Sequence, residues 1–164
     1  VRFIGFTGHK SPHILLNMLK QGFEWDTCQM PINVMDAHYR SFQNEVLPEL
    51  NRRGIGCIGM KSLGGDGQMI NAGLTPQQAR GYALSLPIST LVCGIESMDN
   101  LRQDLEIARN LTPMSKVEMN ALREQVQDQA TDGRNEWFKS TQYYDAATHR
   151  DQHGFPPVGT VGPR

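Results

Sequence analysis

The feature of this sequence that most restricts its fold is a strand followed by a helix, repeated four times in residues 1–110. Short apolar runs predict strands at 2–6, 27–34, 55–60 and 89–93, and a segment with helical periodicity follows each run. This alternation is typical of α/β proteins in which helical crossovers join parallel strands. Because the strands are apolar on both faces, they indicate a covered sheet.

Capping residues mark where the helices begin. Ser11 with Pro12 predicts one helix start, Thr75 with Gln78 a capping box, and Ser97 an N-cap. Pro48 falls inside a helix expected over 42–54 and should kink it or reset its start. A further helix is expected over 115–130. One helical face is expected to hold Ile14, Leu15, Met18 and Leu19, and one face of the next helix Val46, Leu47 and Leu50. The predicted inner face of the helix after Ser97 holds Met98, Leu101, Leu105 and Ala108. The apolar residues of the helix expected over 115–130 are Val117, Ala121, Leu122 and Val126.

Two architectures fit four such units: a small open doubly wound sheet, or half of a (β/α)₈ TIM barrel, which takes about 250 residues when whole. The chain has 164 residues and starts at Val1 inside a run predicted as a buried strand, which favours a truncated half barrel. We therefore expect a half barrel over 1–130 and an irregular tail over 131–164. A half barrel leaves sheet edges open, so dimerisation is one expected outcome, and the oligomeric state stays open.

Composition excludes several classes of protein. The net charge is −1, so no basic field is present to attract nucleic acid. No apolar run reaches the roughly 18 residues of a membrane span, and no signal peptide is evident. The 3 cysteines, Cys28, Cys57 and Cys93, lack metal-ligand spacing and are expected to be buried core thiols. We expect a cytoplasmic protein without a metal, unless an export signal precedes Val1.

Polar residues follow each predicted strand, at the face where barrel enzymes hold their sites. The sequence contains neither the glycine fingerprint of a Rossmann fold nor a P-loop. Gly94 and Ser97 at a helix start predict either a phosphate site or simply a capped helix, and Gly64 permits either a close backbone approach or a hinge. Lys61 could serve as a Schiff-base nucleophile, a fixed cation for phosphate or a surface lysine. His9 is a candidate general base, cofactor contact or loop residue.

Four stretches together resemble the C-terminal half of an aldo-keto reductase from a poorly characterised bacterial branch: IGFTGHK, RRGIGCIGMKSLGG, LTPQQARGYALSLPISTLVCGIESMDNLRQDLEIA and LTPMS. The resemblance covers about residues 1–130. It implies the second half of a (β/α)₈ barrel, a cofactor that is NADP, with NAD possible, and a small aldehyde or ketone that is reduced to an alcohol.

The resemblance also implies where the cofactor lies. A Ser-Asn pair holds the nicotinamide carboxamide in the family, and Gln follows on the next strand. The matching positions here are Thr7, Gly8, His9 and Gln29, so a hydroxyl is kept and the Asn is not. Met60 or Lys61 stands where an aromatic residue often stacks on the nicotinamide.

The remaining positions fall on the other half of the cofactor. Ser62, Leu63 and Gly64 would line the pyrophosphate, and Gly94, Ile95, Ser97, Gln103 and Asp104 would hold the adenosine end. Gly94 and Asn100 replace basic residues that often mark a strong preference for the 2′-phosphate. The choice between NADP and NAD therefore stays open.

The family's catalytic Asp, Tyr, Lys and His belong to the first four barrel strands, which this chain does not include. Lys61 is not the catalytic lysine, no catalytic residue is predicted in this fragment, and we expect no turnover by it alone. Two alternatives stay open: a Schiff-base lyase on a TIM barrel that uses Lys61, and a non-catalytic half barrel that binds a nucleotide.

Overall fold

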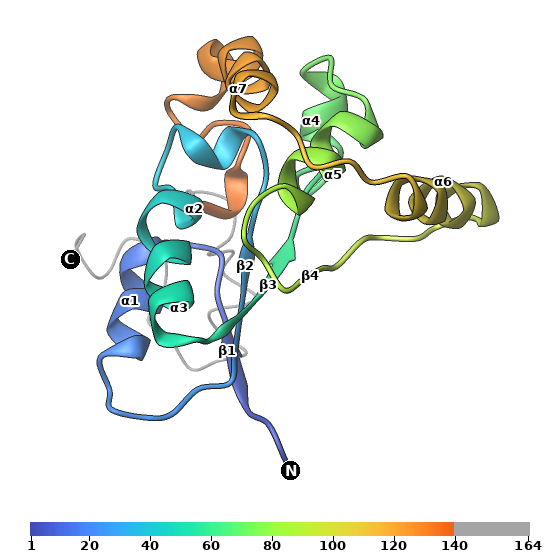
Figure 1. Cartoon of the computed structure of the whole chain (residues 1–164). Coiled ribbons are helices and arrows are strands. Elements are labelled where there is room, and N and C mark those ends of the chain that lie inside the picture. The colour runs from blue at the N-terminus through green and yellow to red at the C-terminus, as the bar shows by residue number, and fades with distance from the viewer. Residues whose placement is uncertain (140–164) are drawn as a thin grey trace, which may run out of the picture.

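The computed structural model describes residues 1–139, which form one sheet of four parallel strands with helices between them (Figure 1). The strands are β1 (Gly5–Thr7), β2 (Thr27–Pro31), β3 (Gly56–Met60) and β4 (Thr90–Leu91), and they lie in the order β1-β2-β3-β4. Thr7 pairs with Gln29 and Gln29 with Ile58, so all carboxyl ends point to one edge of the sheet. The predicted α/β class is confirmed, and the arrangement is consistent with a partial (β/α)₈ barrel.

Each crossover between strands contains at least one helix. α1 (Pro12–Leu19) follows β1. After β2 come the 3-10 helix η1 (Met35–Ala37), α2 (Phe42–Glu45) and α3 (Leu47–Arg53); after β3 come α4 (Gln68–Asn71) and α5 (Pro76–Leu84). α6 (Met98–Arg109), α7 (Lys116–Ala130) and the 3-10 helix η2 (Trp137–Lys139) complete the described chain. In Figure 1, α6 projects away from the sheet, on the side opposite α1 and α3.

The main core lies between the sheet and the helices α1 and α3. Leu15 and Leu19 of α1 and Leu50 of α3 pack against Cys28 and Met30 of β2, and all five side chains are buried. A second core lies under α7, where Met119, Leu122 and Val126 meet Met35 and Met69. Burial of each large apolar side chain contributes about 1.5–3 kcal/mol, so these two clusters hold the helices against the sheet.

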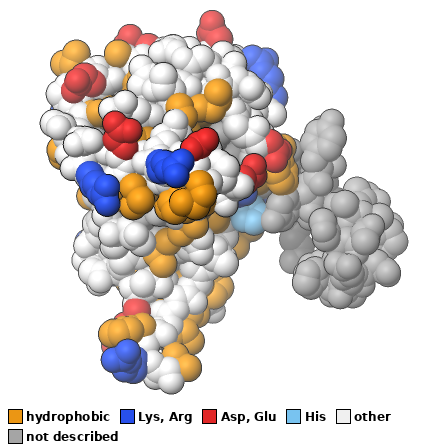
Figure 2. Space-filling model, turned by 90° about the vertical axis from the view of Figure 1, so that its right-hand side faces the viewer, with side chains coloured by type: hydrophobic (Ala, Val, Ile, Leu, Met, Phe, Trp, Pro, Cys, Tyr) orange, Lys and Arg blue, Asp and Glu red, His pale blue; other side chains and the backbone are white. Residues whose placement is uncertain are grey.

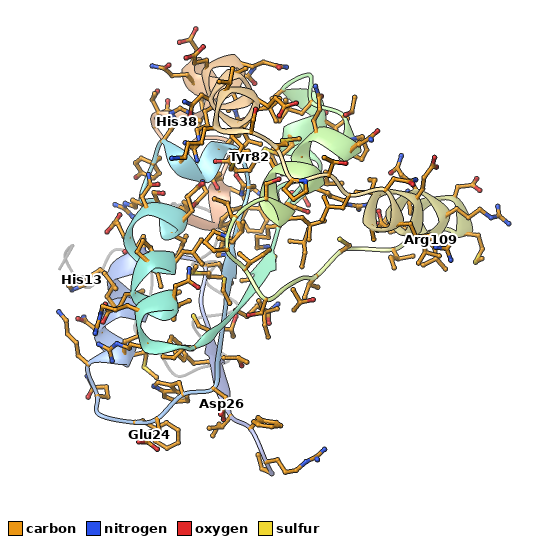
Figure 3. All side chains as sticks on the ribbon, viewed as in Figure 1. His13, Glu24, Asp26, His38, Tyr82 and Arg109 are labelled. Atoms are coloured by element: carbon orange, nitrogen blue, oxygen red, sulfur yellow. The ribbon has the colours of Figure 1, made fainter. Side chains whose placement is uncertain are left out.

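Tyr82 joins three helices through hydrogen bonds. Its hydroxyl donates to Gln43 Oε1 of α2 at 2.7 Å and accepts from Arg123 Nε of α7 at 2.7 Å. Figure 3 shows Tyr82 beneath α7 and near His38. Because α5 is held in this way, the turn of the helix that carries both Tyr82 and Arg80 has a defined position.

Several local predictions are confirmed. Thr75 and Gln78 form a capping box at the start of α5. The helix expected over 42–54 breaks at Val46, and α3 begins with Pro48 in its first turn, where the missing N–H leaves no hydrogen bond unmade. Gly54 ends α3 in the left-handed conformation, with φ 71°.

The start of the chain differs from its prediction. Residues 1–5 are exposed, with Phe3 72% accessible, and the strand begins only at Gly5. The prediction of a buried opening strand is wrong for the described chain because β1 forms one edge of the four-stranded sheet and pairs with β2 alone. The second strand also ends early, at Pro31, although Ile32 N still donates to Met60 O at 2.9 Å.

Some predicted inner faces of helices are also wrong. Met98 is 60% exposed, Leu105 is 42% exposed and Ala108 is exposed, whereas the buried side chain of α6 is Ile107. The helix is turned toward α5 because Asp104 pairs there with Arg80. Among the other apolar helix positions, Ile14 in α1 and Val117 and Ala121 in α7 are exposed. Cys93 is half-buried beyond β4 rather than in the core.

Candidate functional site

A cavity of about 600 Å³ opens between the loops that follow β3 and β4. Its wall has the loop residues 61–67 on one side. The other side is formed by Val92, Cys93, Gly94, Glu96, Asn100 and Gln103, and the helices α4 and α5 add Ile70, Pro76 and Arg80. The cavity therefore lies at the carboxyl edge of a parallel sheet, which is the usual place for a ligand in α/β proteins. Figure 2 views the molecule from the side of α6, where acidic and basic side chains lie among hydrophobic ones.

The loop after β3 turns sharply around the cavity. Lys61 takes a left-handed φ of 58°, and Gly64 and Gly67 follow with φ of 89° and 79°. Gly64 N donates to Lys61 O at 2.9 Å, which closes the first turn. A positive φ is unusual for a lysine and costs free energy, and such residues cluster at functional sites.

The opposite wall is the start of α6. Ser97 is its N-cap: Ser97 Oγ accepts from Asn100 N at 3.1 Å, and Asp99 lies in the first turn. The cap predicted from the sequence is confirmed. The first N–H groups of a helix carry partial positive charge and favour an anion nearby, but this wall also carries the carboxylate of Glu96.

A buried ion pair stands behind the cavity. Arg80 is only 4% exposed, lines the cavity and pairs with Asp104 of α6. Within the described residues, Arg80 Nε has no hydrogen-bond partner. Asp104, expected to touch the adenosine end, does not line the cavity; instead it holds Arg80 in place. Arg80 itself had no local sequence signature, because a single arginine on a helix is most often a surface residue.

Lys61 lies against two aromatic rings from η2. Its Nζ is 5.7 Å from the ring centroid of Trp137 and 5.0 Å from that of Phe138. Burial lowers the pKa of Lys61, and the carboxylate of Asp66 opposes that shift. Trp137 also packs on the backbone of Gly65, where a Cβ would lie 2.8 Å from the indole nitrogen. Lys61 is thus held between the glycine loop and the aromatic pair.

The residues expected at the nicotinamide end lie on β1 and β2. Thr7 Oγ1 and Gly8 N both donate to Gln29 O at 3.1 Å, which brings these three residues together. The His9 ring lies 6.2 Å from the Phe138 ring. Burial, Lys61 and Lys10 lower the pKa of His9, so the imidazole favours its neutral form near Lys61.

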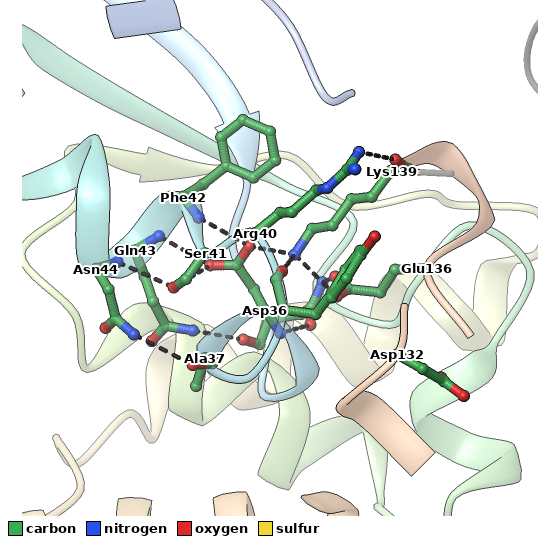
Figure 4. Close-up of polar contacts among 12 residues, drawn as sticks. Asp36, Ala37, Arg40, Ser41, Phe42, Gln43, Asn44, Asp132, Glu136 and Lys139 are labelled. Atoms are coloured by element: carbon green, nitrogen blue, oxygen red, sulfur yellow. Dashed lines mark hydrogen bonds and ion pairs between the residues drawn. The ribbon is translucent and has the colours of Figure 1, made fainter. Parts of the chain in front are cut away.

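A buried polar network fixes η2 over this edge of the sheet (Figure 4). Lys139 Nζ lies 2.6 Å from Asp36 Oδ1 and 2.8 Å from Glu136 Oε2, and it donates to Tyr39 O at 2.8 Å. Asn33 Nδ2 donates to Glu136 Oε1 at 3.1 Å. The three charged side chains are at most 1% exposed. This network holds Trp137 and Phe138 beside Lys61.

The network predicts a pH dependence of stability. Burial raises the pKa of Glu136 to about 7 from 4.5, with Lys139 opposing and Asp36 adding to the shift. Between these two values the folded protein binds a proton that the unfolded chain has released, so the free energy of unfolding falls as the pH rises from 4.5 to about 7. Glu136→Gln should flatten this slope, as measured by urea unfolding at pH 5 and pH 8. The substitution Glu124→Gln, at an exposed residue, should leave this pH dependence unchanged. If Glu136→Gln and the unaltered chain showed the same dependence of unfolding free energy on pH, the assignment of this dependence to Glu136 would be contradicted.

The structure gathers some of the expected cofactor residues and separates others. Lys61, Ser62, Leu63, Gly64, Gly94 and Gln103 line the cavity, whereas Thr7, Gly8, His9, Gln29 and Met60 lie outside its wall. Ile95 is 53% exposed, and Ser97 caps α6 beside the cavity. Sequence reasoning missed Arg80, Asp66 and the aromatic pair of η2 as members of the site. The predicted tail beyond residue 139 lies outside the described residues.

Solved structures with the same fold are aldo-keto reductases. The chain is similar to the aldo-keto reductase AKR11C1 from Bacillus halodurans in its holo and apo forms, each with a TM-score of 0.57, 15% identity, and coverage of 85% of this chain and 54% of that one. It is also similar to the thermostable aldo-keto reductase Tm1743 in complex with the inhibitor epalrestat, with a TM-score of 0.54, 17% identity, and coverage of 76% and 48%. No protein-family model and no curated protein matches the sequence.

These similarities show the fold: the chain has the α/β architecture of about half an aldo-keto reductase barrel, and it spans about half the length of the structures it matches. Within residues 1–139, no helix has the length and apolar character that a membrane crossing requires. The same residues hold no cluster of three or more His, Cys, Asp or Glu side chains that could bind a metal ion.

Proposed function

We propose that this chain is the cofactor-binding half of an NAD(P)H-dependent aldo-keto reductase that converts aldehydes or ketones to alcohols. The observation that carries the proposal is the cavity at the carboxyl edge of the sheet, with the nearly buried Arg80 in its wall. The similarity of fold to aldo-keto reductases supports it.

The residues of the cavity fit a nicotinamide dinucleotide. The guanidinium of Arg80 and the ammonium of Lys61 suit the pyrophosphate, and the glycine loop lets backbone come close to it. Asn100 and Gln103 supply amide groups toward the adenosine end. When bound, such a cofactor supplies a hydride for a carbonyl carbon. This chain contributes binding, orientation and the exclusion of water by Trp137 and Phe138; the acid that protonates the carbonyl oxygen would come from elsewhere in the barrel.

Ser97 gives a test of whether the dinucleotide approaches the start of α6. Ser97→Asp keeps a side chain that caps the helix but adds a negative charge, whereas Ser97→Asn keeps the cap without the charge. We expect Ser97→Asp to weaken NADPH and NADH binding about tenfold and Ser97→Asn to leave it nearly unchanged. Quenching of Trp137 emission during titration with each dinucleotide measures the affinity of each variant. Equal affinities for the two variants would show that the dinucleotide does not approach this wall.

A second candidate function rests on Lys61. Burial lowers the pKa of this lysine, which lies beside two aromatic rings, and a partly desolvated lysine can attack a carbonyl to form a Schiff base. A lyase on this half barrel predicts that borohydride traps an aldehyde on Lys61, visible as an added mass on the peptide that contains it. Lys61→Met should abolish the adduct, with Lys116→Met as the surface control. An unmodified Lys61 peptide would exclude this function.

A further inference from the structure

The charges around the cavity decide which dinucleotide it accepts. Four charged side chains line it: Lys61 and Arg80 are cationic, and Asp66 and Glu96 are anionic. The charge of Arg80 is already balanced by Asp104 behind the wall. Among the described residues, no carboxylate forms an ion pair with Lys61. Lys61 is therefore the cation of the cavity wall whose charge is not balanced by such a contact.

We infer that the cavity selects NAD(H) over NADP(H), with Arg80 as the pyrophosphate ligand and Glu96 as the residue that excludes a 2′-phosphate. This inference rests on the function proposed above. The pyrophosphate of either dinucleotide needs one or two cationic donors, which Arg80 and Lys61 supply. A 2′-phosphate adds further negative charge and needs another cation.

The wall at the start of α6 offers a carboxylate instead of that cation. Glu96 lies between Gly94 and the N-cap Ser97, and it lines the cavity together with Asn100 and Gln103. A carboxylate accepts a hydrogen bond from a ribose 2′-hydroxyl and repels a phosphate at the same position. This wall therefore favours an adenosine whose 2′-hydroxyl is free.

The ion pair between Arg80 and Asp104 explains why Arg80 does not reverse this preference. The side chains of Asp104 and Arg80 are 12% and 5% exposed. To bind a 2′-phosphate, Arg80 would have to separate from Asp104, and separating two charges in such a poorly solvated place is costly. Because a guanidinium carries five N–H donors and Arg80 lines the cavity, Arg80 can donate to the pyrophosphate while the pair stays intact.

Titration calorimetry of the full 164-residue chain with NADH and with NADPH tests the inference. We expect NADH to bind at least about tenfold more tightly than NADPH. Glu96→Arg should tighten NADPH binding by about tenfold or more and change NADH binding by less than about threefold. Glu124→Arg, an exposed residue of α7, makes the same change in net charge away from the cavity and should have no effect on either ligand.

Two results would overturn the inference while leaving the proposed function in place. One is NADPH binding as tightly as NADH to the unaltered chain, and the other is Glu96→Arg leaving NADPH binding unchanged. Binding of neither dinucleotide to the chain would overturn the proposed function itself, and the inference with it.

Discussion

Lys139→Met is expected to lower the free energy of unfolding by about 3–5 kcal/mol at pH 8, the cost of removing one partner from a buried ion pair. Lys139 is fully buried and lies between the carboxylates of Asp36 and Glu136. Without it, Asp36 keeps hydrogen bonds from Phe42 N at 3.0 Å, Gln43 N at 2.8 Å and Ser41 Oγ at 3.4 Å. Urea unfolding followed by circular dichroism measures the loss. The emission of Trp137 should also shift to the red, because η2 loses its anchor.

The control for Lys139 is an ion pair in solvent. Arg102 and Asp99 of α6 lie 2.9 Å apart with side chains 71% and 90% exposed, so Arg102→Ala should cost less than about 1 kcal/mol. Adding Asp36→Asn to Lys139→Met should recover part of the lost stability, because it removes the stranded charge. A loss for Lys139→Met no larger than that for Arg102→Ala would show that the network does not hold η2.

Arg80→Leu is expected to weaken NADH binding by more than about tenfold and to destabilise the fold by about 3–5 kcal/mol. The substitution removes the proposed pyrophosphate donor and leaves the carboxylate of Asp104 without its cation in the interface between α5 and α6. Calorimetry with NADH measures the first effect and urea unfolding measures the second. Arg109→Leu, an exposed substitution in the last turn of α6, should leave both quantities nearly unchanged.

The double variant Arg80→Leu with Asp104→Leu separates binding from stability. An apolar pair of similar size often replaces a buried ion pair at little cost, so this variant should regain most of the lost stability. It should still bind NADH weakly, because the donor is absent. Recovery of NADH binding together with stability would show that Arg80 supports the fold and does not meet the cofactor.

Local sequence signals predicted much of the fold. The sequence alone reveals features that depend on residues within one helical turn. Examples are the capping box of Thr75 and Gln78, the left-handed Gly54 and the new helix that begins near Pro48. The four-fold alternation of strand and helix likewise predicted the parallel sheet and its carboxyl edge. Loops that follow parallel strands meet at that edge. The sequence could therefore predict that residues 61–64 and Gly94 belong to one site, and they line the same cavity.

Long-range charge pairs could not be predicted in the same way. Lys139 pairs with Asp36, which lies 103 positions away in the sequence. Neither residue belongs to a local motif that would predict the other as its partner. The pair of Arg80 and Asp104 also turned α6, so the apolar periodicity of Met98 and Leu105 predicted the wrong buried face. Hydrophobic periodicity finds a helix, but a buried ion pair can decide which side of it faces the protein.

The most direct test of a dinucleotide site in this cavity is amide chemical-shift mapping with NADH added to the isotopically labelled chain. We expect the largest shifts in residues 61–67 and 92–103, with a smaller change at the indole N–H of Trp137. The amides of α1 and α3, on the other side of the sheet, should stay unchanged. Shifts confined to residues outside these two loops, or no shifts at saturating NADH, would contradict the assignment of this cavity as the cofactor site.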